Sequence, residues 1–176
     1  MKKNMIIISV ITVTGTLLFT ILYLLIKLPL FLTLAITFGT TAYHFVMRLI
    51  VGFVFNILLK NKADYSKRRY QIRPWEKKLY KKLKVKKWKK YMPTFVPELF
   101  DTNKHSLDEI AQAMCQAELV HETIIILSFA PLLFTIWFGD FWIFLITSIL
   151  AAMFDLCFVI MQRYNRPRII RLIKKR

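Results

Sequence analysis

The sequence predicts an all-α membrane protein with four transmembrane helices and a basic cytoplasmic loop that contains an interfacial amphipathic helix. Two observations predict this architecture. Of the 176 residues, 56% are hydrophobic, and they are gathered in blocks long enough to cross a bilayer, which takes about 20 residues. Between these blocks, residues 60–97 hold fifteen lysines and arginines against two acids. Because lysine and arginine are biased to the cytoplasmic side, we expect a multi-pass membrane protein with the loop and both termini inside.

The apolar blocks are expected to form a single integral membrane domain, residues 1–176. The expected helices are 5–26, 30–59, 107–138 and 141–161. No small-residue cleavage site follows the first block, so it should remain as a helix rather than leave as a signal peptide. Pro29 separates the first two helices because proline cannot continue the helical hydrogen bonding. The second helix is longer than a bilayer core, so it should tilt or project into the cytoplasm.

The basic loop carries a helix signal of its own. Pro74 suits a first helical turn, and Trp75, Leu79 and Leu83 follow at i, i+4 and i+8 among lysines. An apolar stripe set among lysines is typical of a helix that lies flat on a membrane. We therefore expect an interfacial helix here, with a plain solvated loop as the alternative.

The third and fourth helices also have recognisable boundaries. Ser106 and Glu109 form a capping box, which predicts a helix start near Leu107. Pro131 is expected to kink the third helix before a short turn leads to the fourth. The C-terminal tail, residues 162–176, carries seven basic residues and no acid.

The second and fourth helices contain polar residues that a lipid-facing sequence does not explain. His44, Arg48 and Asn56 lie on or near one face of the second helix, and Asp155 lies in the fourth. Ionisable groups in a membrane usually face the bundle interior or a wet cavity, where they find partners. We therefore expect Arg48 and Asp155 to approach one another. A structural ion pair and a catalytic role both remain open for them.

A second polar group lies where the third helix enters the membrane. Glu118 stands at i, i+3 and i, i+4 from His121 and Glu122, so its carboxylate could orient the imidazole. Such a pair can accept a proton from a hydroxyl during acyl or glycosyl transfer. A solvated helix entrance is the alternative interpretation.

The fourth helix ends in a polar heptapeptide that is expected to face this group. Its members are Gln162, Arg163, Tyr164, Asn165, Arg166, Pro167 and Arg168. Arginine binds phosphate through two parallel hydrogen bonds, while asparagine and glutamine can hold a carbonyl or a sugar hydroxyl. The pattern predicts a binding site for a lipid substrate at the membrane surface, with the proline as the expected stop.

Three stretches resemble the bacterial glycosyl-4,4'-diaponeurosporenoate acyltransferases, small membrane proteins of carotenoid synthesis, and their relatives. They are Lys86-Lys87-Trp88-Lys89, Ala117 to His121, and Gln162 to Arg168. The resemblance runs from the loop to the C-terminus, whereas the first two helices match only as hydrophobic sequence.

The resemblance implies transfer of a fatty acyl group, from acyl-CoA, to a hydroxyl of a membrane-held glycolipid or isoprenoid-type acceptor. In that interpretation His121 is the general base and Glu118 its orienting partner. Arg163, Asn165 and Arg166 would hold the donor phosphate or the developing oxyanion, and Gln162 and Tyr164 are further expected substrate-binding residues. Lys86, Lys87 and Lys89 would steer the donor, and Trp88 would anchor in the interface.

Two other function classes stay open. One is a non-catalytic membrane subunit or lipid-binding scaffold that meets a partner subunit. The other is a small oligomeric transporter or channel lined by His44, Arg48 and Asp155. Membrane lipid and the anionic phospholipid surface are the expected partners, with a homo-oligomer as a further option. We expect no cofactor, no metal site and no specific nucleic acid partner.

Overall fold

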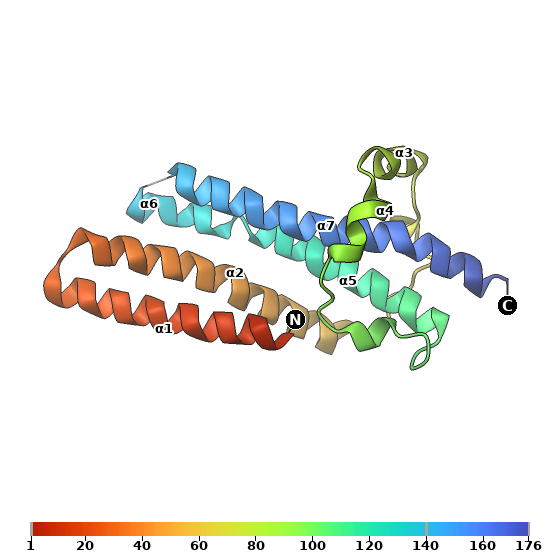
Figure 1. Cartoon of the computed structure of the whole chain (residues 1–176), viewed down its shortest axis with the longest axis horizontal. Helices are drawn as coiled ribbons and strands as arrows, with labels where there is room; N and C mark the ends of the chain where they lie inside the picture. The colour runs from red at the N-terminus through yellow and green to blue at the C-terminus, as the bar shows by residue number, and fades with distance from the viewer. Residues whose placement is uncertain (1, 140, 176) are drawn as a thin grey trace.

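The computed structural model describes residues 2–139 and 141–175, and helices dominate it (Figure 1). The long helices are α1 (Lys2–Ile26), α2 (Pro29–Leu59), α5 (Leu107–Leu127) and α7 (Phe141–Ile173). The short elements are η1 (Arg68–Tyr70), α3 (Pro74–Lys82), α4 (Val85–Trp88), η2 (Lys89–Tyr91), η3 (Pro97–Phe100), η4 (Ala130–Phe134) and α6 (Thr135–Phe138).

The long helices form two antiparallel pairs that lie side by side (Figure 1). In the first pair, Lys27 takes a left-handed backbone conformation with φ 61°, which turns the chain sharply between α1 and α2. A side chain at Gly15 would collide with the ring of Phe38, so glycine permits these two helices to pack closely. In the second pair, α5 packs along α7, and α2 contacts α5 between the pairs. Met47 and Val51 of α2 pack there against Ile124.

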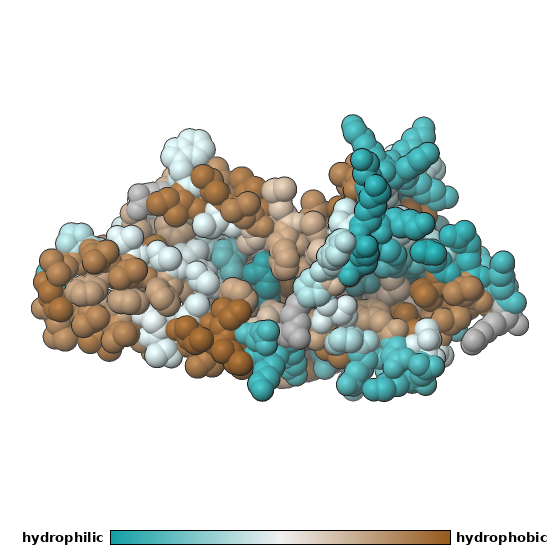
Figure 2. Space-filling model, viewed as in Figure 1, coloured by the Kyte–Doolittle hydropathy of each residue, from teal (hydrophilic) through white to brown (hydrophobic). Residues whose placement is uncertain are grey.

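Four helical segments are long and apolar enough to cross a membrane, as expected. They are Lys2–Ile26, Pro29–Leu59, Leu107–Phe138 and Phe141–Ile173. Many of their large apolar side chains, such as Leu25 and Ile136, point outward, which suits contact with lipid. Figure 2 shows hydrophobic residues over the end with the helix turns and hydrophilic residues over the opposite end. We call that hydrophilic end, where the loop folds, the basic end.

The third span is interrupted near the expected proline. Helix α5 stops at Leu127, and the chain continues as the 3-10 helix η4 and the short helix α6. Pro131 has no amide hydrogen to donate, so the ordinary helical hydrogen bonding cannot pass through this point. At the position of the expected kink, the chain therefore forms the tighter 3-10 helix η4.

The expectation that Pro167 ends the fourth helix is wrong. Helix α7 runs from Phe141 to Ile173 with Pro167 inside it, so most of the expected tail is helical. One consequence is that the polar heptapeptide is displayed at helical spacing, with Gln162 and Arg166 buried and neighbouring positions facing elsewhere.

The basic loop is folded onto the ends of α5 and α7. Its helix α3 begins at Pro74, as expected, and projects from the side of the bundle at the basic end (Figure 1). Trp75, Leu79 and Leu83 are exposed, at 57%, 37% and 43%, whereas Tyr80 is buried. The helix therefore presents an apolar face that the rest of the protein does not cover.

Candidate functional site

A cavity of about 1140 Å³ lies between the two helix pairs. Side chains of α2, α5 and α7 form most of its wall, and the loop segment 93–100 closes part of the basic end. The wall is mainly apolar, with a small number of polar groups. A smaller hydrophilic area is visible near the middle of Figure 2, surrounded by hydrophobic residues. An apolar cavity with few polar groups is the usual form of a small-molecule site.

Three charged or titratable groups meet at this cavity. Nδ1 of His121 on α5 lies 2.8 Å from Oδ1 of Asp155 on α7. The other carboxylate oxygen, Oδ2, accepts hydrogen bonds from Nε and Nη2 of Arg48 on α2 at 3.1 and 2.5 Å. Arg48 also donates to the carbonyl of His44. The expected approach of Arg48 and Asp155 is therefore confirmed, and His121 is the third member.

The hydrogen bond of His121 uses only one of its two ring nitrogens. Its ring stacks on Phe158 at a centroid distance of 4.5 Å and an interplanar angle of 6°. The packing and the bond to Asp155 together fix the plane of the imidazole. Within the described residues, Nε2 has no hydrogen-bonding partner, and His121 lines the cavity. In a neutral imidazole with Nδ1–H donated to the carboxylate, Nε2 is an acceptor.

His44 is the other histidine of the cavity wall, one helical turn before Arg48. It is only 8% exposed, and neither ring nitrogen has a partner in the part of the chain described. A buried polar group without a partner is costly, so its presence needs an explanation. The side chain of Asn56 lines the same cavity toward the basic end.

The structure corrects the expected partner of His121. The carboxylate of Glu118 is fully buried and binds two arginines, with Oε1 2.5 Å from Nη1 of Arg163 and Oε2 2.5 Å from Nη1 of Arg166. Asp155, 34 positions along the chain, orients the imidazole instead. Glu122 pairs with Arg69 at 2.6 Å near the surface.

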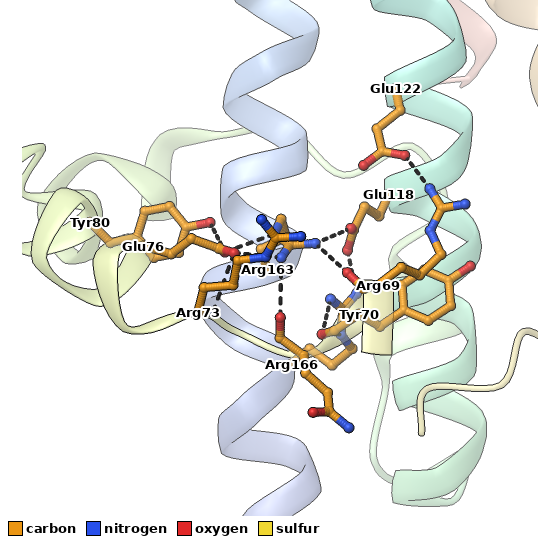
Figure 3. Close-up of polar contacts among 10 residues, drawn as sticks. Arg69, Tyr70, Arg73, Glu76, Tyr80, Glu118, Glu122, Arg163 and Arg166 are labelled. Carbon is orange, nitrogen blue, oxygen red and sulfur yellow. Dashed lines mark hydrogen bonds and ion pairs between the residues drawn. The ribbon is translucent and has the colours of Figure 1, made fainter. Parts of the chain in front are cut away.

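Arg163 and Arg166 are occupied by internal partners rather than open to a phosphate. Figure 3 shows them between Glu118 and the loop. Arg163 also binds Glu76 of α3 through two hydrogen bonds, at 2.8 and 2.7 Å. Arg166, 1% exposed, donates to the carbonyl of Tyr70 at 3.2 and 2.6 Å. Two carboxylates and two guanidiniums thus tie the loop to α5 and α7.

Electrostatic effects in this cluster agree with its geometry. Burial works to raise the pKa of Glu76, but hydrogen bonds from Arg163 and Tyr80 outweigh it, and the pKa is lowered from its ordinary value. Burial and the bond to Glu76 raise the pKa of Tyr80, which stays protonated and donates. Each carboxylate of the cluster therefore lies beside at least one guanidinium, and the two negative charges balance the two positive ones.

The remaining predicted binding residues divide between two places. Gln162 lines the cavity on the face of α7 that carries Asp155 and Phe158. Tyr164 and Asn165 lie outside it, beside Lys89 of the loop, whose ammonium donates to Oδ1 of Asn165. Lys86 and Lys87 are exposed on α4, and the indole of Trp88 donates to the carbonyl of Leu83. His121 and Asn165 therefore do not share one pocket.

Sequence reasoning missed two contributors. Glu76 is one of only two acids in a strongly basic segment, and that rarity was the available signal that it has a dedicated partner. Phe158, which supports the His121 ring, carried no signal because it looks like any apolar residue of the fourth span. No group of three metal-ligating side chains with suitable spacing occurs among residues 2–139 and 141–175.

The fold and the site define an integral membrane protein with a histidine and carboxylate pair in an apolar cavity. The family model for glycosyl-4,4'-diaponeurosporenoate acyltransferase matches residues 66–175, from the loop to just beyond the end of α7. The chain belongs to this family of membrane acyltransferases. No curated protein and no solved structure matches the chain.

Proposed function

We propose that this protein transfers a fatty acyl group from a thioester donor to a hydroxyl group of a membrane-held glycolipid or isoprenoid-type acceptor. The single observation that carries the proposal is the hydrogen bond from His121 to the buried carboxylate of Asp155 inside a large apolar cavity. Membership of an acyltransferase family supports the reaction class. We propose that the reaction occurs at the cytoplasmic leaflet, because the basic end carries the lysine-rich loop and lysine is biased to the cytoplasmic side.

His121 is proposed as the general base. With Nδ1 bound to Asp155, Nε2 can accept the proton of the acceptor hydroxyl as the oxygen attacks the acyl carbonyl carbon. Arg48 supports Asp155, since the guanidinium supplies the opposite charge to a buried carboxylate. Asp155 and Arg48 are positioning residues in this scheme. The arrangement resembles the logic of a nucleophile, base and orienting acid, in which the substrate hydroxyl is the nucleophile.

The steps balance as a simple exchange of thiol for alcohol. A new C–O bond forms to the acyl carbon, and the C–S bond of the thioester breaks. The thiolate that leaves takes the proton from the imidazolium of His121. The products are the acylated acceptor and a free thiol, and the base returns to its starting form.

The cavity wall supplies groups for the remaining tasks. Its apolar surface suits the acyl chain and the lipid part of the acceptor. Gln162 is proposed to hold the carbonyl oxygen, because its amide lies on the helix face of Asp155 and Phe158. His44 is proposed to bind a polar group of the acceptor, because a ligand would supply the hydrogen bond that its buried ring lacks.

The direct test compares lipid extracts of cells by mass spectrometry, with and without the protein. His121→Ala should lower the formation of the acylated lipid by about 100-fold to 10,000-fold, the usual contribution of a general base. His105→Ala is the matched control, because His105 lies in the loop outside the cavity and should leave the yield unchanged.

Two outcomes would contradict the proposal. If His121→Ala is inserted at the normal level and still makes the acylated lipid at the wild-type rate, His121 is not the base. If the wild-type protein makes no acylated lipid but assembles with a membrane partner, the scaffold interpretation replaces catalysis.

A further inference from the structure

A group of cations lies outside the cavity, where α4 meets α7, and we call it the cationic site. Lys86 comes from α4, Lys89 from the 3-10 helix η2 that follows it, and Arg168 from the C-terminal part of α7. Figure 1 shows α4 lying against α7 at this point. Within the described residues, none of these three cations forms a salt bridge. This separates them from Arg163 and Arg166, whose charges are matched internally.

Lys89 is held in a defined position within this group. Its ammonium donates to Oδ1 of Asn165 and lies 4.8 Å from the ring centroid of Tyr164. Burial lowers the pKa of Lys89, and the positive charges of Arg168 and Lys86 lower it further. The Lys89 ammonium is therefore partly buried, oriented by Asn165 and Tyr164, and repelled by two nearby cations. No anionic side chain among the described residues balances its charge.

The site lies outside the cavity but is close along the chain to residues of its wall. On α7, Met161 and Gln162 line the cavity, and Asn165 follows them by one helical turn. In the loop, Pro93 begins the segment that lines the cavity, four residues after Lys89. Two separate stretches of chain therefore run directly from the cationic site to the cavity wall.

The distance along α7 limits the kind of ligand that could use both places. From Asp155, which contacts His121, to Asn165 is ten residues of helix, or about 15 Å at 1.5 Å per residue. In a glycerophospholipid the phosphate lies only a few bonds from the acyl ester, which is too short for this separation. A donor with a spacer arm between phosphate and acyl carbonyl would span it, and a phosphopantetheine thioester has such an arm.

We propose that Lys86, Lys89 and Arg168, with Asn165 and Tyr164 beside them, bind the phosphate of a phosphopantetheine thioester whose acyl chain enters the cavity. This inference rests on the proposed acyl transfer and assigns the donor site within it. The same arm occurs in two sources, acyl-CoA and acyl-loaded acyl carrier protein. Both carry the phosphate that the three cations would recognise through charge-assisted hydrogen bonds.

The test is equilibrium binding to the full-length protein in phosphatidylcholine nanodiscs, with empty nanodiscs as the blank. The probes are palmitoyl-CoA and palmitoyl acyl carrier protein. The double variant Lys89→Gln/Arg168→Gln should weaken binding of at least one probe by about tenfold or more, as expected when charge-assisted hydrogen bonds are lost. The matched control, Lys90→Gln/Arg171→Gln, removes the same charge from exposed neighbours and should change affinity less than about threefold.

Two further variants separate this inference from the proposed chemistry. His121→Ala should bind the donor with wild-type affinity while failing to acylate, so loss of turnover alone does not affect the donor site. Lys86→Gln removes an exposed charge and should weaken binding without any effect on folding. The probe whose affinity falls in the double variant shows whether the donor is acyl-CoA or acyl-loaded acyl carrier protein. The assignment is wrong if the double variant and Lys86→Gln bind both probes as tightly as the wild-type protein.

Discussion

The imidazole of His121 on α5 and the carboxylate of Asp155 on α7 form a hydrogen bond of 2.8 Å between the two helices. The second oxygen of that carboxylate belongs to Arg48 on a third helix. The buried side chain of Asp155 thus joins three transmembrane helices, α2, α5 and α7. This contact, the cluster around Glu118 and the helix α3 each lead to testable predictions.

The pair of Arg48 and Asp155 should show strong coupling in stability. Arg48→Leu or Asp155→Leu alone leaves an uncompensated buried charge and should cost about 3–5 kcal/mol. The double variant Arg48→Leu/Asp155→Leu should regain most of that loss, because neither charge remains. Unfolding in detergent micelles by titration with sodium dodecyl sulfate measures this cycle. Additive losses in the double variant would show that the two side chains do not interact.

Glu118 should be needed to keep the loop folded onto the bundle. Glu118→Gln removes the negative charge that lies between the guanidiniums of Arg163 and Arg166 and offsets their repulsion in the buried cluster. Trypsin should then cleave the lysine-rich loop much faster than in the wild-type protein. Glu122→Gln is the matched control, because its exposed pair with Arg69 is worth at most about 1 kcal/mol. Equal cleavage rates in the two variants would contradict this role.

The contribution of Glu76 to stability should depend on pH. Its pKa in the folded protein lies below the ordinary value of 4.5, because hydrogen bonds from Arg163 and Tyr80 outweigh the effect of burial. A carboxyl group with a lowered folded pKa stabilises the fold above its unfolded pKa and loses that effect as pH falls through the folded pKa. The difference in unfolding free energy between wild type and Glu76→Gln should therefore be largest near neutral pH.

Below pH 4.5 that difference should shrink progressively. Unfolding titrations from pH 7 to pH 3 measure it, and Glu98→Gln, which removes an exposed carboxyl group, controls for the loss of one charge. A difference that stays constant over this range would contradict the assignment of the shift to Glu76.

The apolar face of α3 should lie in the membrane interface. Trp75, Leu79 and Leu83 are exposed on that face among lysines, and a lysine-rich amphipathic helix binds anionic lipid. A polarity-sensitive fluorophore attached at Leu79→Cys, in a Cys157→Ser background, should shift to shorter wavelength in vesicles that contain phosphatidylglycerol. The same fluorophore at Lys81→Cys, on the opposite side of the helix, should not. Identical spectra at the two positions would favour the solvated loop.

The sequence by itself determined the membrane architecture and one of its internal contacts. Four apolar blocks and a lysine-rich loop were sufficient for the four spans, because length and hydrophobicity are local properties of the chain. The approach of Arg48 and Asp155 was also predictable, since a charge inside a membrane must find an opposite charge. The capping box at Ser106 and the start of α3 at Pro74 are local signals of the same kind.

Only the tertiary structure decided which carboxylate serves His121. The i, i+3 spacing favoured Glu118, yet that side chain is directed to Arg163 and Arg166, and Asp155 reaches the imidazole across the interface of two helices. The rotation and register of α5 against α7 decide these partners, and both come from the packing of many apolar side chains. Spacing along one helix says which residues share a face, but the facing residues on another helix are set by packing energy summed over the whole contact.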